Sequence, residues 1–444
     1  MTHSSLRQMA VGLGATLVWL DFAVNVAFPD IVQSFALAIG DVQWVVIAYV
    51  LTYTSLMLIV GRLGDMLGHA RVFRLGLLWS AGALLLCALA PSFPLLLLCR
   101  FLQGIGAALI LSCGPALATS LESEERRSRV LGVYTMMMAA GATLGPVLGG
   151  VLTAKWGWPA VFWFRVPVAL AALAALGPIS SPPRSAAGER FDTAGALLLV
   201  AALVAFVLAL NRISGIAAWP LALLSLAALV GFIRQELRAP APIIDLRVFR
   251  LPGFALVNAA SVLTNLAAFA VWLLVPFYLL ETRGLSFADS GLLLAAASLG
   301  AIVAGPGGAT LTRWIASSRL AAIGVAMVGA GLALIAFWDR GTATAALLAA
   351  LLLQGLGLGV FQLAYLDIVT ATIAREARGV AGSLAMVTRT LGTVSAATIV
   401  MLLFRHLAAT GDFLAAFGAS FTFAAVLAFA TAALLASHRR QGRR

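Results

Sequence analysis

Charge is scarce in this chain. Of its 444 residues only 10% are charged, whereas 62% are hydrophobic, and the mean hydropathy is +1.03. Soluble domains carry roughly 25% charged residues and 45–50% apolar ones. Because so much apolar surface cannot be hidden in one soluble core, the composition excludes a soluble protein and indicates an integral membrane protein in a lipid bilayer.

Lysine is nearly absent, since Lys155 is the only one among 29 basic residues. It precedes Trp156 rather than Ser or Thr, so it does not belong to a phosphate-binding loop of the GxxxxGK[ST] type. ATP is therefore excluded as the energy source by that route. The net charge of +12 comes from arginines scattered in short loops, with no basic face or DNA-binding motif, so no nucleic-acid partner is expected.

Cysteine and histidine are also few, with three and four residues. The cysteines lie in apolar runs with no zinc-site spacing, and a disulfide framework is not expected. The histidines lie in loops or near the termini. With no nucleophile, metal or cofactor constellation in view, the sequence predicts neither a metal nor a cofactor, and not an enzyme.

Long apolar runs are abundant. A membrane helix needs about 20 apolar residues, and fourteen runs qualify. They cover about 10–29, 43–61, 72–90, 95–118, 129–152, 158–178, 193–211, 217–233, 253–280, 288–311, 318–337, 342–370, 379–404 and 412–436. The predicted fold is therefore an all-α membrane protein with 14 transmembrane helices.

Arginine is distributed unevenly between the loops. With the N-terminus inside the cell, inside segments contain twenty-one arginines and outside loops contain five basic residues. The positive-inside rule then places both termini in the cytoplasm.

The chain also repeats itself at an offset of 251 residues. Gln103-Gly-Ile-Gly106 recurs as Gln354-Gly-Leu-Gly357, and Glu125 and Arg127 recur as Glu376 and Arg378. Chance similarity between glycine-rich runs is the alternative explanation. Two homologous six-helix halves explain the common register better, and such parallel halves are a transporter architecture with the substrate site near the midplane. The predicted parts are a first half at 1–178, an inserted helix pair with linkers at 179–252, a second half at 253–436 and a basic tail at 437–444.

Five charged residues are candidates for charge inside the hydrocarbon: Asp21, Arg100, Arg165, Asp367 and Arg389. Each costs at least ~2.5 kcal/mol, so each needs a reason. Asp21 is near mid-membrane, where burial favours its neutral form and a neighbouring arginine favours its ionised form, as a proton carrier requires; a static ion pair is the alternative. Arg100 is the expected partner of Asp21; the alternative is that the Arg100 side chain extends to the outer membrane interface. Arg389 is expected to face a cavity. Asp367 is expected at the cytoplasmic interface, and Arg165 has no assigned role.

Two glycine motifs stand out. Gly61, Gly64, Asp65, Gly68 and Arg71 form the turn between the second and third runs, in which Asp65 is expected to act as a latch on a neighbouring helix N-terminus; a plain turn is the alternative. The fifth run contains a second motif, which predicts close helix packing. Its residues are Gly141, Gly145, Pro146, Gly149 and Gly150. Expected cavity-lining residues are Asn25, Gln103, Met137, Asn265 and Arg389, with methionine as an adaptable apolar group.

Together these motifs resemble the major facilitator superfamily. Gly61–Arg71 is similar to its loop 2–3 signature, Arg100–Gly104 to its fourth-helix RxxQG, and Gly141–Gly150 to the gxxxGPxxGG signature of its antiporter branches. The segments Leu20–Pro29 and Met386–Gly392 resemble the fourteen-helix drug/proton antiporters (EmrB/QacA-like).

The resemblance implies a major facilitator fold in a bacterial inner membrane, acting as a monomer that exports small molecules by alternating access in exchange for protons. It makes Asp21 and Arg100 the proton-coupling pair and Asp65 the gate residue. Arg165 is a departure, since the branch commonly has Asn there. Because few acids lie in the membrane, a neutral, zwitterionic or anionic substrate fits at least as well as a dication. A narrow metabolite exporter and a non-transporting membrane sensor remain as alternatives to a drug exporter.

Overall fold

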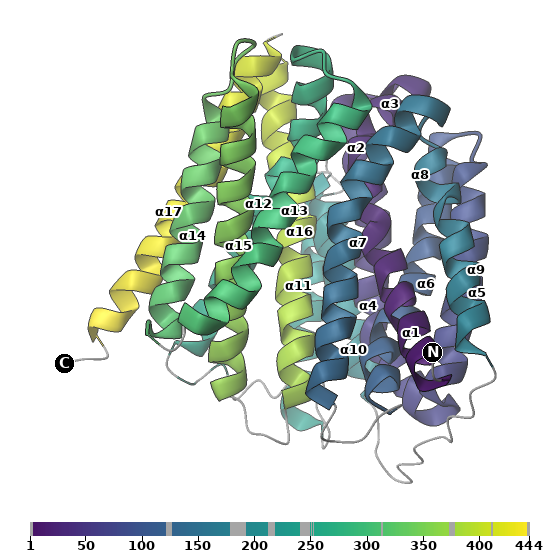
Figure 1. Ribbon diagram of the computed structural model, residues 1–444. Helices are drawn as coiled ribbons and strands as arrows, with labels where there is room; N and C mark the ends of the chain where they lie inside the picture. Colours follow the sequence, from purple (N-terminus) through teal and green to yellow (C-terminus); the bar gives the residue numbers. More distant parts are fainter. Residues whose placement is uncertain are drawn as a thin grey trace. The chain divides into compact units, whose positions relative to one another are not determined.

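The computed structural model describes residues 3–120, 127–177, 192–211, 218–239, 249, 251, 253–311, 314–372, 378–409 and 412–441, and all regular secondary structure in these residues is helical. Most of the predicted linkers at 178–191 and 240–248, and the last three residues of the tail, lie outside these ranges. Figure 1 shows the long helices, coloured in sequence order.

The helices before the first linker are α1 (His3–Trp19), η1 (Leu20–Phe22), α2 (Ala23–Val26), α3 (Phe28–Ser34), η2 (Ile39–Val42), α4 (Gln43–Leu67), α5 (His69–Ala88), α6 (Phe93–Ser120), α7 (Arg127–Trp156), α8 (Ala160–Trp163) and α9 (Arg165–Leu176). The later helices are α10 (Thr193–Asn211), α11 (Ala218–Arg238), α12 (Phe254–Phe277), the π-helical turn η5 (Tyr278–Thr282), α13 (Phe287–Leu311), α14 (Ser317–Ala336), α15 (Thr344–Thr372), α16 (Arg378–Ala408) and α17 (Phe413–Gln441).

Within the described ranges, twelve helices are long and apolar enough to cross a membrane. Each lies on one of the predicted runs. The two remaining predicted runs coincide with shorter apolar helices at Ala160–Leu176 and Ala194–Phe206. A multi-pass membrane protein is therefore confirmed, and the count of fourteen spans stays a prediction.

The chain forms two compact units. The first comprises Met1–Val204, Ala239–Ile243 and Ser286–Leu292, and the second comprises Ala205–Arg238, Ile244–Leu285 and Leu293–Arg444. This division into two units does not test the boundaries of the four parts that the sequence predicts, and those boundaries stay predictions.

The sequence repeat corresponds to similar helix packing within each unit. In the first unit, a Cβ at Gly104 of α6 would lie 2.8 Å from the backbone oxygen of Tyr49 on α4. In the second unit, a Cβ at Gly355 of α15 would lie 1.9 Å from the backbone oxygen of Ala297 on α13. Two residues on, Gly106 faces Ser80 of α5 and Gly357 faces Val328 of α14. In both units the repeated glycines are therefore places where helix backbones touch.

The first membrane-spanning run is not one regular helix. It changes from α to 3₁₀ geometry over Leu20–Phe22, and then continues through α2 and, after Ala27, α3. A 3₁₀ turn in the middle of a helix often marks a hinge or a functional position. Pro29 adds a break, because it lacks the N–H that would bond the carbonyl of Asn25. The irregular part of this run thus includes Asp21.

Candidate functional site

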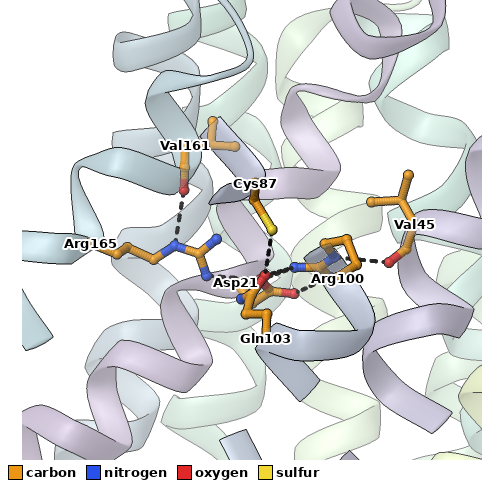
Figure 2. Close-up of polar contacts among 7 residues, drawn as sticks. All are labelled: Asp21, Val45, Cys87, Arg100, Gln103, Val161 and Arg165. Carbon is orange, nitrogen blue, oxygen red and sulfur yellow. Dashed lines mark hydrogen bonds and ion pairs between the residues drawn. The ribbon is translucent and has the colours of Figure 1, made fainter. Parts of the chain in front are cut away.

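Asp21 accepts hydrogen bonds from three side chains (Figure 2). Arg100 approaches it with both terminal nitrogens, Nη1 at 2.7 Å from Oδ1 and Nη2 at 2.8 Å from Oδ2. Gln103, one turn further along α6, donates from Nε2 to Oδ1 at 3.0 Å. A bidentate arginine–carboxylate pair is among the strongest side-chain interactions in proteins, and it requires the ionised carboxylate. The structure therefore brings the predicted pair together.

Arg100 is held in place independently of Asp21. Its Nε donates to the backbone oxygen of Val45 at 3.0 Å, and Nη1 donates to Gln103 Oε1 at 2.7 Å. Its guanidinium carbon lies 4.3 Å from the ring centroid of Tyr49, a cation–π contact. Arg100 is 1% exposed, so it does not extend to the membrane surface, which was the alternative interpretation.

Arg165 is a second cation on the same carboxylate. Its Nη1 donates to Asp21 Oδ1 at 2.8 Å, while its Nε donates to the backbone oxygen of Val161 at 2.9 Å. The side chain is fully buried, and its Nη2 has no hydrogen-bond partner among the described residues. The sequence identifies Arg165 as a charged residue in an apolar run but predicts no role for it, because nothing in the sequence shows that α9 orients this residue toward α1.

The cluster carries more positive than negative charge. One carboxylate faces two guanidinium groups, so the three side chains sum to one positive charge when Asp21 is ionised. Gln103, Tyr49 and Cys87 complete the surroundings, and the Cys87 thiol lies 3.8 Å from Gln103 Oε1. Protonation of Asp21 would leave two buried guanidinium groups without their anionic partner, which is unfavourable unless the site rearranges. Such a site can couple proton uptake to movement of side chains and helices.

The turn between α4 and α5 contains the predicted gate motif. Asp65 Oδ1 lies 3.2 Å from the Nε2 atom of His69, the first residue of α5. Gly64 packs against His69 and Cys113, whereas no atom of the described residues lies within 4 Å of the position where Gly61 would carry a Cβ. The gating role of Asp65, with Arg71, stays a prediction.

Gly68 is the residue of this motif whose backbone conformation favours glycine. Its φ of 92° lies in the region that side-chain-bearing residues rarely adopt. We expect Gly68→Ala to destabilise the protein by about 1–2 kcal/mol, the typical cost of left-handed geometry. Thermal unfolding of the purified protein measures this change. Gly61→Ala is the matched control in the same motif, and an equal loss of stability in both variants would contradict the backbone explanation.

The second glycine motif lies along α7. Gly141 faces the backbone oxygen of Thr16, Gly145 that of Leu20, and Gly149 the backbone of Ala23. Within the first unit, a Cβ at Gly150 would lie 2.2 Å from the backbone oxygen of Phe287. Pro146 also lies inside this helix, and its carbonyl oxygen meets Gly291 in the same unit. The close packing that the sequence predicted is confirmed, and the glycines lie against the irregular turn that contains Asp21.

The remaining expected cavity residues are in different surroundings. Asn25 is buried in α2, one turn after Asp21. Met137 is half-buried and packs against Gly12 of α1. In the second unit Asn265 of α12 is buried and donates to the backbone oxygen of Ser261, and Arg389 of α16 is half-buried. Their role in binding a substrate stays a prediction.

A neutral hydrogen-bond network joins three helices next to Arg389. Tyr365 of α15 donates to Asn258 Oδ1 at 2.8 Å, and the hydroxyls of Ser261 and Thr388 lie 2.9 Å apart. Sequence reasoning missed this network, because its members are spread over α12, α15 and α16 and carry no charge. Asp367 is exposed and accepts a hydrogen bond from Ser317, as fits an interfacial carboxylate.

No group of three or more His, Cys, Asp or Glu residues suited to a metal ion occurs in the part of the chain that the structure describes. The Asp21 cluster is held by two ion pairs and by a hydrogen bond from Gln103.

A helical membrane protein with a buried acid–arginine cluster and glycine-packed helices has the features of a secondary transporter. Residues 11–397 match the family model described as Major Facilitator Superfamily. The chain therefore belongs to this superfamily.

Two relatives carry names that refer to resistance or export. One is Multidrug resistance protein Stp of Mycobacterium tuberculosis, 33% identical over 68% of this chain. The match spans only 57% of that relative's own length. The other is the Tetracenomycin C resistance and export protein of Streptomyces glaucescens, 31% identical over 85% of this chain and 71% of the relative.

The fold is also found among solved structures. A crystal structure of an auto-inhibited peptide transporter of the POT family matches with a TM-score of 0.74 at 17% identity, over 98% of this chain and 97% of that one. At this level of identity the likeness concerns the fold alone.

Proposed function

We propose that this chain is a secondary active transporter that exports drugs or other hydrophobic, toxic small molecules in exchange for protons. The observation that carries the proposal is Asp21, a carboxylate in a membrane-spanning segment that accepts four hydrogen bonds from Arg100, Gln103 and Arg165. An intramembrane acid with basic partners is characteristic of proton relays in transporters. The names of the two relatives support export as the direction.

The coupling step follows from the geometry of the cluster. A proton on Asp21 removes the negative charge that holds Arg100 and Arg165, and it weakens charge-assisted hydrogen bonds to groups on α6 and α9. Asp21 lies in the 3₁₀ turn between α1 and α2, against glycines of α7. Protonation is therefore expected to change the position of this turn relative to its neighbours, and release of the proton to restore it.

The proposal includes the finer topology. It comprises fourteen spans, with the helices at Ala160–Leu176 and Ala194–Phe206 as the two shorter ones, and membership of the fourteen-helix drug/proton antiporters. It also comprises two six-helix halves with an inserted pair, both termini in the cytoplasm, and action as a monomer in a bacterial inner membrane. The arginine asymmetry between loops supports this orientation.

A narrow exporter of an anionic or zwitterionic metabolite is the second candidate. One observation favours it: the carboxylate of Asp21 already faces two guanidinium groups, which leaves it unsuited to binding a cationic substrate. Arg389 on α16 is an additional intramembrane cation. This candidate is also an exporter, but it transports a narrow rather than a broad range of substrates.

Proton flux in energised inverted membrane vesicles tests the proposal. A pH-sensitive dye reports proton release when candidate cations, neutral compounds and anions are added one at a time. We expect at least one compound to release protons from vesicles that contain the protein and not from vesicles without it. Binding of a compound without any proton release or translocation would instead indicate a membrane sensor.

Competition between compounds separates the two export candidates. Mutual inhibition among chemically unrelated compounds is expected of a drug exporter. A response limited to one acidic or zwitterionic compound, unaffected by the others, would replace the drug exporter by the metabolite exporter.

A further inference from the structure

We propose that Arg165 is a second counter-ion that must leave Asp21 before this carboxylate takes up a proton, so that Arg165 sets the pH range of proton exchange. This inference rests on the proposed function, in which Asp21 is the proton carrier. Arg165 touches Asp21 rather than a substrate, and it acts as a positioning residue.

The two arginines are attached to Asp21 to different degrees. Arg100 makes two hydrogen bonds to the carboxylate, one to each oxygen, and is anchored to Val45 and Gln103 as well. Arg165 makes one, to Oδ1 alone. Release of Arg165 thus costs one charge-assisted hydrogen bond, whereas release of Arg100 costs two and disturbs its other contacts.

The crowding at Oδ1 points to Arg165 as the group that leaves. This oxygen accepts from Arg100, Gln103 and Arg165 at 2.7, 3.0 and 2.8 Å, which is one donor more than its two lone pairs readily serve. Arg165 Nη2 meanwhile is buried with no hydrogen-bond partner in the described part of the chain. Its Nε bond to Val161 keeps the side chain tethered after Oδ1 is released.

The other groups near Asp21 do not duplicate this role. Helix α4 brings Tyr49, with Tyr53 in edge-to-face contact beside it, and α5 brings Cys87. Helix α6 brings Arg100 and Gln103, with Cys99 next to Arg100 in sequence. Helix α7 contacts the turn through glycine backbone, as described above. Among the described residues, Arg100 and Arg165 are therefore the two permanent charges in contact with Asp21, and Arg165 is the one more readily released.

A pH titration of Asp21 tests the inference directly. The purified protein in lipid nanodiscs is titrated while infrared difference spectra record the carboxyl band that the Asp21→Asn variant lacks. Loss of an opposite charge in contact with a carboxylate typically shifts its titration upward by about 1–3 pH units. We expect this shift in Arg165→Asn and in Arg165→Gln, two neutral variants of which either suffices if the other does not fold. Arg165→Lys, which keeps the charge, is expected to titrate closer to the wild type.

Arg74→Gln is the matched control, because Arg74 donates to the backbone oxygen of Gly177 at the end of α9, away from the cluster. It is expected to leave the midpoint unchanged. If both neutral Arg165 variants titrate like the wild type, or if the band is absent from the wild type and from both variants over the whole pH range, the inference is wrong. A band that appears only in the neutral variants supports it.

Vesicle assays separate this result from the proposed function. The pH at which compound-driven proton release is half-maximal should move upward in Arg165→Asn, in parallel with the infrared midpoint. If no compound drives proton release in any variant, proton exchange fails as the function. The infrared shift would still show that Arg165 controls the protonation of Asp21.

Discussion

Replacing Asp21 by Asn is expected to abolish compound-driven proton release while the protein still reaches the membrane. Asparagine keeps the shape of the side chain and one acceptor oxygen, but it cannot exchange a proton at any physiological pH. Proton release in inverted vesicles should fall more than tenfold, to the level of vesicles that lack the protein. This is the largest functional effect that we expect from a single substitution.

The same substitution has a cost in stability that the experiment must separate from the loss of coupling. Asp21→Asn leaves Arg100 and Arg165 buried without an anion, and breaking a buried ion pair in this way typically costs about 3–5 kcal/mol. The double variant Asp21→Asn with Arg165→Asn returns the cluster to one positive charge. We expect the double variant to accumulate and unfold more like the wild type, yet to remain unable to release protons.

Asp30→Asn is the control for an acidic residue in the same irregular run. Asp30 accepts the backbone N–H of Trp158 at 2.6 Å, and the amide oxygen of asparagine can accept it as well. This variant should retain proton release. Normal proton release by Asp21→Asn would exclude Asp21 as the proton carrier and would leave its cluster with a purely structural role.

The second large effect is expected at Gly149. A Cβ there would lie 2.7 Å from both the Cα and the backbone oxygen of Ala23, and backbone atoms cannot move aside as a flexible side chain does. Gly149→Ala should therefore force α7 away from the turn that contains Asp21. Overpacking of this kind typically costs about 1–3 kcal/mol, and it should also impair coupling because the turn itself is displaced.

Gly132→Ala is the matched control on the same helix, since nothing in the described part of the chain lies within 4 Å of a Cβ at that position. In a helix interior the change from glycine to alanine is otherwise favourable by about 0.5–1 kcal/mol. Thermal unfolding and vesicle proton release are measured for both variants. Equal stability and equal transport of the two would mean that α7 does not need its close approach to Ala23.

Much of the fold could be predicted because it depends on local composition. Each of the twelve long helices lies on a predicted apolar run, and the repeat at an offset of 251 residues corresponds to similar packing of Gly104 and Gly355. The glycine motif of α7 also packs as expected. Gly61 has no such contact within the described residues, and the sequence does not show this, because whether a glycine meets a neighbour depends on the direction in which it faces.

The site was only partly predictable. Asp21, Arg100 and Gln103 were identified because polar groups are costly inside an apolar run and because they match a known pattern. Arg165 was noticed on the same ground, but its contact with Asp21 depends on how α9 packs beside α1. The Tyr365–Asn258 network had no such signal, since neutral polar residues are common in membrane helices.

By itself the sequence determined that this protein resides in a membrane as a bundle of helices, and which charges it holds there. These properties depend on transfer free energies that add up residue by residue along the chain. Only the tertiary structure decided that one carboxylate meets two arginines, that one oxygen accepts three donors and that Arg165 Nη2 has no partner among the described residues. Such contacts depend on the rotation and spacing of helices far apart in the chain, which close glycine packing determines.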